Sequence, residues 1–146
     1  MKNAEQARVY KEVLTVLDTF NLIDAIPQNV IGKMIREQDR DYEYSFDVNT
    51  PIEEQKISRK AATILSVLYL KYICADDNEK QELKAIYEKN NETPEYKAYR
   101  DEIAQDFNDS ENEEGNKAVE NDKLSMQPQN ILEKIKQFFE KLFRKV

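Results

Sequence analysis

The side chains most typical of nucleophilic and metal sites, histidine and cysteine, are scarce in this sequence, and its carboxylates are plentiful but show no distinctive arrangement. The chain has no histidine, which removes the commonest general base and a common metal ligand. Cys74 is the only cysteine, so neither an intrachain disulfide nor a Cys/His nucleophile pair can form. Gly32 and Gly115 stand alone, and no glycine-rich phosphate loop exists. We therefore expect a protein that is not an enzyme, with no catalytic residue, cofactor or metal site.

The acidic residues between positions 39 and 47 are the nearest approach to a metal-binding pattern. The carboxylates that could gather near a cation are those of Asp39, Asp41, Glu43 and Asp47. The segment 47–58 begins like a calcium loop, but it has neither the turn glycine nor the closing glutamate. A solvated face is the more ordinary interpretation, and we prefer it.

The elements that must position any site are mostly helices. Apolar residues recur at three- and four-residue spacing, which places them on one face of a helix. The stretches that follow this pattern are 4–20, 28–37, 58–75, 77–90 and 94–107, with Thr50-Pro51 as a further short helix start. The stretch 58–75 is the most apolar and is predicted to lie at the centre of the fold, with Cys74 in the core. In 28–37, we expect Val30, Ile31, Met34 and Ile35 to point inward.

The segment 41–48 has a different periodicity. Aromatic and apolar residues alternate with polar ones, beginning with Tyr42 and ending with Val48. Period two indicates an extended segment with one buried face. Because no second segment of this kind exists, we expect this strand to lie across helices or to pair with another chain through its free edge. The tyrosines at 42, 44, 96 and 99 could form a recognition surface, but a core role with the hydroxyl toward water is favoured.

Net charge limits the class of partner. The formal charge is −7, and 35% of residues are charged. A nucleic-acid-binding domain normally presents a basic face, so no direct nucleic-acid contact is expected. An acidic inhibitor that mimics nucleic acid remains an alternative to ordinary solubility. The N-terminus is too polar for a secretory signal and the longest apolar run, 61–70, is too short to span a bilayer. We expect a cytoplasmic protein, with peripheral attachment at the inner membrane face as an alternative.

The C-terminal part differs from the rest in composition. Residues 108–129 are acidic and polar, and are predicted to be a flexible linker. Residues 130–146 form an amphipathic helix with five basic and two acidic residues, a net charge of +5 − 2 = +3. The remainder of the chain therefore carries −7 − 3 = −10. Such a division indicates two parts with different functions or different partners.

The terminal helix is the predicted binding site. Its apolar side would enter a membrane interface or a groove on a partner protein, while its basic side would face anionic groups. The residues assigned to this role are Ile131, Leu132, Ile135, Phe138, Phe139, Leu142, Phe143, Lys134, Lys141, Arg144 and Lys145. The alternative is an ordinary last helix that folds back and docks on the domain. The prediction of a binding helix depends on the bundle leaving the apolar side uncovered.

Four segments between Tyr10 and about Asn90 carry a resemblance to known proteins: YKEVLTVLDTF, IPQNVIGKM, DYEYSFDVNTPIEEQKIS and YLKYI. Through them, just over half of the chain resembles a family of short uncharacterised helical proteins from Gram-positive, Clostridia-like bacteria. The resemblance implies a bacterial, cytoplasmic origin and a helical architecture with a Lys/Phe-rich tail. It implies no activity, so it adds no site residue.

The prediction is an all-α protein: a bundle of about five helices with one extended segment (1–107), the acidic linker (108–129) and the amphipathic basic helix (130–146). The predicted function is that of a non-enzymatic adaptor or regulatory protein whose last helix binds a membrane surface or a protein partner. The alternatives are an acidic nucleic-acid mimic of mobile-element origin, or a simple compact helical protein with the last helix docked.

Overall fold

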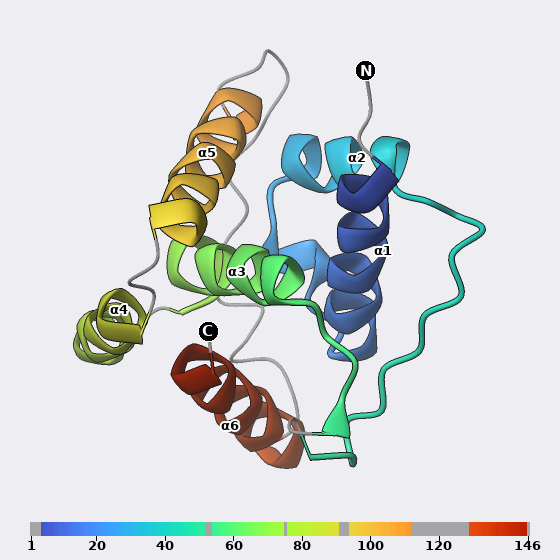
Figure 1. Cartoon of the computed structure of the whole chain (residues 1–146). Helices are drawn as coiled ribbons and strands as arrows, with labels where there is room; N and C mark the ends of the chain where they lie inside the picture. The colour runs from blue at the N-terminus through green and yellow to red at the C-terminus, as the bar shows by residue number, and fades with distance from the viewer. Residues whose placement is uncertain (1–3, 52–53, 75, 91–93, 112–128, 146) are drawn as a thin grey trace.

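The computed structural model of the protein describes residues 4–51, 54–74, 76–90, 94–111 and 129–145 (Figure 1). Over these residues the fold is all α-helical, as predicted, and no strand is present. The α-helices are α1 (Ala4–Thr19), α2 (Gln28–Glu37), α3 (Arg59–Leu68), α4 (Asp77–Asn90), α5 (Pro94–Glu111) and α6 (Gln129–Lys145). A short 3₁₀ turn, Ile23–Ala25, joins α1 to α2, and a π-helical turn, Tyr69–Ile73, continues α3.

Helix α3 lies at the centre of the bundle, as its apolar sequence predicts (Figure 1). It packs against α1, α5 and α6, while α2 packs against α1 and α5, and α4 packs against α6. Every residue from Ala61 to Leu68 is buried. Helix α3 begins after Ser58, whose hydroxyl oxygen accepts a hydrogen bond from the Ala61 N–H at 3.1 Å. This cap satisfies one of the backbone donors that the first turn of a helix leaves unpaired.

The central helix widens at its C-terminal end. In the turn Tyr69–Ile73, the Cys74 N–H donates to the Tyr69 carbonyl oxygen, five residues back, at 2.7 Å. The wider turn changes the angular position of the residues that follow. Tyr69, Tyr72 and Ile73 are consequently all buried, and Leu70 is partly buried. Cys74 is buried, as expected.

One residue of α2 does not lie where its spacing predicts. Val30, Ile31 and Met34 are buried, but Ile35 is 38% exposed, so its predicted inward orientation is wrong. Ile35 lies in the last turn of α2, beside an open groove that Ile23 also lines.

The segment 41–48 is extended, but it does not form a strand. Its period-two pattern predicts the alternating burial of 41–47, where Tyr42, Tyr44 and Phe46 are half-buried and the residues between them are exposed. The prediction is wrong for Val48, which is 36% exposed. Of the two predicted arrangements, the structure has the first, because the segment lies across helices. Phe46 contacts Phe20 at the end of α1, with ring centroids 5.5 Å apart. Side-chain packing on one face therefore holds this segment without a partner strand.

The tyrosines of α5 have structural contacts, which agrees with the favoured core role, but the predicted orientation of the hydroxyl toward water is wrong for Tyr99, whose hydroxyl bonds within the protein. The Tyr99 hydroxyl donates to Gln6 Oε1 at 2.8 Å and so joins α5 to α1. The guanidinium of Arg59 lies 4.0 Å from the ring centroid of Tyr96, a cation–π contact at the start of α3. Both tyrosines are half-buried.

The boundary predicted at residue 107 falls too early. Helix α5 continues to Glu111, and Ser110 in its last turn is 5% exposed, so the helix remains in contact with the bundle there. Helix α6 begins at Gln129. Positions 112–128, which make up most of the predicted linker, lie outside the described residues, as do 52–53 after the predicted helix start at Thr50.

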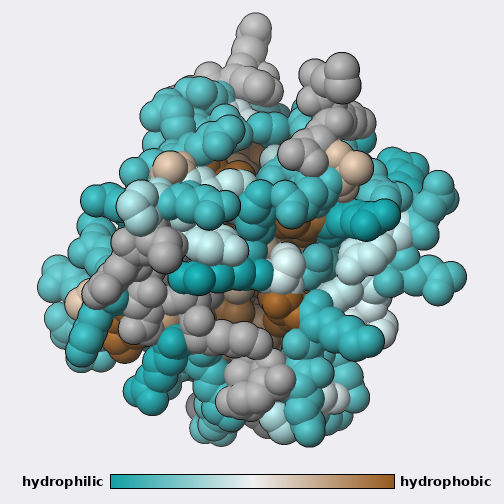
Figure 2. Space-filling view, in the orientation of Figure 1, coloured by the Kyte–Doolittle hydropathy of each residue, from teal (hydrophilic) through white to brown (hydrophobic). Residues whose placement is uncertain are grey.

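The surface seen in the orientation of Figure 1 is mainly hydrophilic, and hydrophobic residues appear chiefly in recesses (Figure 2). Among the described residues, no helix combines the length and the hydropathy needed to cross a bilayer.

Candidate functional site

The apolar side of α6 is buried in the core of the bundle. Ile135, Phe139, Leu142 and Phe143 are 0% exposed, and Phe138 is 9% exposed. The expectation that the bundle leaves this side uncovered is therefore wrong, and these five residues form no free binding face. The docked arrangement, which the sequence left open as an alternative, is the one in the structure. The side chains of Ile131, Leu132 and Lys145 lie outside the described part.

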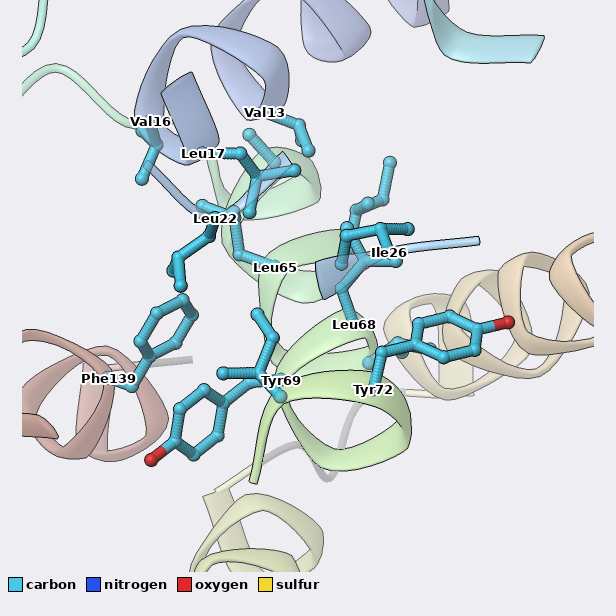
Figure 3. Packing of buried hydrophobic residues seen from close by; sticks show 14 of the residues in the cluster. Val13, Val16, Leu17, Leu22, Ile26, Leu65, Leu68, Tyr69, Tyr72 and Phe139 are labelled. Carbon is cyan, nitrogen blue, oxygen red and sulfur yellow. The ribbon is translucent and has the colours of Figure 1, made fainter. Parts of the chain in front are cut away.

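Aromatic contacts hold α6 in place. The Phe139 ring stacks on Tyr69, with centroids 4.3 Å apart and planes inclined by 18°. Figure 3 shows Phe139 reaching from α6 toward Tyr69 and Leu22. Phe138 contacts Phe20 and Phe46, with centroid distances of 5.1 and 5.2 Å. Such pairs contribute about 0.5–1.5 kcal/mol each beyond their buried area.

The reason for docking is that α6 completes a hollow lined by distant segments. Phe20 directly follows α1, Phe46 belongs to the extended segment and Tyr69 begins the π turn. Each ring would expose apolar surface if α6 were absent, at roughly 25 cal/mol per Å². Helical spacing identifies the apolar side of α6, but it carries no signal for this complementary hollow.

The Tyr69 hydroxyl ties the same region to α4. It donates to Glu79 Oε1 at 2.9 Å. Burial raises the pKa of Tyr69 strongly, and the negative charge of Glu79 raises it further. The phenol consequently remains a protonated donor at neutral pH. The role of Tyr69 is structural, because its hydroxyl joins the π turn to Glu79 of α4 and its ring joins the turn to Phe139 of α6.

The basic side of α6 remains on the surface. Lys134, Lys136, Lys141 and Arg144 are exposed. Arg144 Nη2 lies 2.9 Å from Glu140 Oε1, one turn earlier on the same helix. Of the predicted site residues, the structure thus leaves three described cations accessible: Lys134, Lys141 and Arg144.

Two of these cations line a cleft between α6 and the segment 48–51. The cleft has a volume of about 210 Å³, and Lys134, Lys141 and the edge of Phe138 line its α6 side. Asn49 and Thr50 line the opposite side. Lys134 Nζ donates to Asn49 Oδ1 at 3.3 Å, which links the two walls.

Asp47 holds the loop side of this cleft. Its carboxylate accepts the Asn49 N–H at 2.9 Å and the Thr50 hydroxyl at 3.2 Å. The Gln55 amide donates to the Thr50 carbonyl oxygen at 3.1 Å and also to the Asp47 carbonyl oxygen. Asp47 and Asn49 are spaced as at the start of a calcium loop, but here this spacing stabilises a turn. Among the described residues, no group of three or more Cys, Asp or Glu side chains is placed to hold a metal ion.

The chemistry of this site is that of an anion-binding surface. Ammonium groups on α6 attract carboxylates, and the side-chain NH2 of Asn49 can donate hydrogen bonds beside them, whereas the Thr50 hydroxyl already donates to Asp47. Sequence periodicity identified the lysines, but the loop partners Asn49 and Thr50 were missed, because they lie far away in the chain.

Comparisons with known proteins found no relative of this chain. No protein-family model matches the chain, and neither the curated proteins nor the solved structures contain a match to it.

Proposed function

We propose that this protein is a non-enzymatic adaptor or regulator that binds an acidic surface of a partner protein through the outer face of α6. The observation that carries the proposal is the division of α6 in the folded chain: its apolar side is in the core, while Lys134, Lys141 and Arg144 are exposed. The cleft beside the segment 48–51 adds hydrogen-bond donors next to these cations.

The magnitudes favour a docked helix over one inserted in a membrane. Undocking α6 would expose five buried apolar side chains, each stabilised by roughly 1.5–3 kcal/mol, and also the rings that they cover. That total, on the order of 10 kcal/mol, is comparable to the whole stability of a domain. Attraction to anionic headgroups supplies only about 1 kcal/mol per lysine or arginine. Binding through the exposed cations needs no undocking.

The charge division favours a protein partner over a membrane. The chain outside residues 130–146 carries −7 − 3 = −10, which a broad anionic bilayer would repel. A partner protein can present carboxylates to α6 alone. Electrostatic complementarity of this kind mainly sets the association rate and the choice of partner.

The test uses charge reversal in the full chain, since deleting α6 would remove part of the core. The variant Lys134→Glu/Lys141→Glu is compared with Lys89→Glu/Lys97→Glu, which makes the same charge change at two exposed lysines outside the cleft. The immobilised proteins are incubated with lysate at low and high salt, and captured proteins are quantified by mass spectrometry. We expect acidic proteins that elute with salt to be lost only with the α6 variant.

Unchanged capture by the α6 variant, or equal loss with Lys89→Glu/Lys97→Glu, would contradict the proposal. Vesicles of phosphatidylcholine with and without phosphatidylserine form the second arm. The protein could instead sediment with the anionic vesicles in a way that depends on Lys134 and Lys141, and capture no protein. That result would identify a membrane, and not a protein, as the partner of α6.

A further inference from the structure

A second basic surface lies away from the cleft described above. An open groove of about 460 Å³ runs between the end of α3, α4 and α5. Val67, Leu70 and Ala104 provide its apolar part; Val67 is 8% exposed and the other two are partly buried. None of the terminal-helix residues predicted from the sequence lines it.

Cations surround the apolar part of this groove. They come from three elements: Lys71 from the π turn, Lys80 and Lys84 from α4, and Arg100 from α5. Glu88 and Asp101 are the acidic residues of the lining, so the net charge is +4 − 2 = +2. The whole chain carries −7. A local positive field in an acidic protein selects ligands that carry negative charge.

The carboxylates already present do not neutralise all of these cations. Arg100 Nη2 lies 3.4 Å from Asp101 Oδ1, and the Arg100 side chain is only 18% exposed. Within the part of the chain that the structure describes, no ion pair involves Lys80 or Lys84. Lys84 is exposed and Lys80 is half-buried, so both ammonium groups are available to a ligand in the groove.

The π turn contributes the floor and one side of the groove. Within the turn, Tyr69, Tyr72 and Ile73 are buried, whereas Leu70 and Lys71 are not. Single π turns within α-helices are rare and occur frequently at functional sites. Here the turn keeps three side chains in the core and leaves Leu70 and Lys71 beside α4 and α5.

The combination of an apolar floor and basic sides matches one class of ligand. We infer that the groove binds an acidic amphipathic segment of a partner protein, with apolar side chains on Leu70 and carboxylates near Lys80, Lys84 and Lys71. A helix that carries apolar residues three and four positions apart presents such a face. Nucleic acid is a poorer match, because phosphate binding gains nothing from the apolar floor.

The experiment measures binding of a fluorescent synthetic helix to the full chain by anisotropy. The probe has leucines on one side and glutamates along its edges. Its matched control has the same composition, with the leucines distributed around the helix. We expect the probe to bind more tightly than the control and its affinity to fall as salt is added.

Charge reversal tests the groove itself. Lys80→Glu/Lys84→Glu is expected to weaken binding of the probe about tenfold or more, and Leu70→Ala to weaken it at constant charge. Lys134→Glu/Lys141→Glu is the control and should bind normally, which separates this inference from the function proposed for α6. Circular dichroism establishes that each variant is folded.

Two results would overturn the inference. One is equal affinity for the amphipathic probe and its permuted control, because the apolar floor would then play no part. The other is a probe affinity that Lys80→Glu/Lys84→Glu leaves unchanged. Displacement of the probe by a DNA duplex in proportion to its phosphate content would count against a peptide ligand and assign the groove to nucleic acid.

Discussion

Tyr69 and Phe139 stack face to face, with ring centroids 4.3 Å apart, although 70 positions separate them in the chain. This contact joins the π turn of the central helix to the last helix. It makes α6 part of the core, and it decides which side of α6 can meet a partner.

The first prediction concerns the stability contributed by this contact. Phe139→Ala should lower the free energy of unfolding by about 3–5 kcal/mol, because it removes a fully buried ring and leaves a cavity. Urea denaturation followed by far-ultraviolet circular dichroism measures the change. Lys136→Ala, on the exposed side of the same helix, is the control and should change it by less than about 0.5 kcal/mol. Similar values for the two variants would mean that α6 is not docked in solution.

The second prediction concerns a buried carboxyl group on α1. Glu12 is 5% exposed and accepts the Ser58 N–H at 2.8 Å. Burial raises the pKa of Glu12 despite this hydrogen bond. The folded state therefore binds the proton more tightly than the unfolded state, and ionisation costs stability.

The ordinary pKa of a glutamate is about 4. As pH rises from that value through the raised pKa of the folded state, the contribution of Glu12 to the free energy of unfolding therefore falls. Glu12→Gln keeps an acceptor for Ser58 and removes the charge. Urea denaturation across this window should show the variant gaining stability relative to the parent as pH rises. A constant difference between the two proteins would refute the assignment.

The third prediction contrasts two tyrosine hydroxyls. In the described part of the structure, the buried Tyr44 hydroxyl has no hydrogen-bond partner, whereas the Tyr69 hydroxyl donates to Glu79. Tyr44→Phe should leave the thermal midpoint unchanged or raise it, and Tyr69→Phe should cost about 1 kcal/mol or more. Calorimetry compares the two variants. If Tyr44→Phe lowered stability as much as Tyr69→Phe, the Tyr44 hydroxyl would have a hydrogen-bond partner in solution.

The fourth prediction concerns the single thiol. Cys74 is 6% exposed, and burial raises its pKa, so the reactive thiolate is scarce and shielded in the folded chain. A thiol reagent such as dithionitrobenzoate should react slowly with the native protein and rapidly in denaturing urea. Phe139→Ala should accelerate the native reaction by raising the open population. Equally fast labelling of the native and denatured proteins would contradict this burial.

Local features of the sequence were sufficient to predict most of the secondary structure. The spacing of apolar residues predicts α1 and α2 nearly to their ends, and Ser58 marks the start of α3 because its hydroxyl caps the first turn. The alternation in 41–47 predicts which side chains are half-buried, although it fails at Val48 and the described residues include no partner strand. These properties depend on neighbours within a few positions.

Tertiary structure alone decided the position of α6 and the sites that remain accessible. An amphipathic helix has the same sequence pattern whether its apolar side meets a bilayer, a partner or its own domain, since all three remove the same surface from water. Phe20, Phe46 and Tyr69 form the hollow that receives α6, and only folding brings them together. The same packing assembles the basic groove from α3, α4 and α5, because its cations come from segments with no shared pattern in the chain.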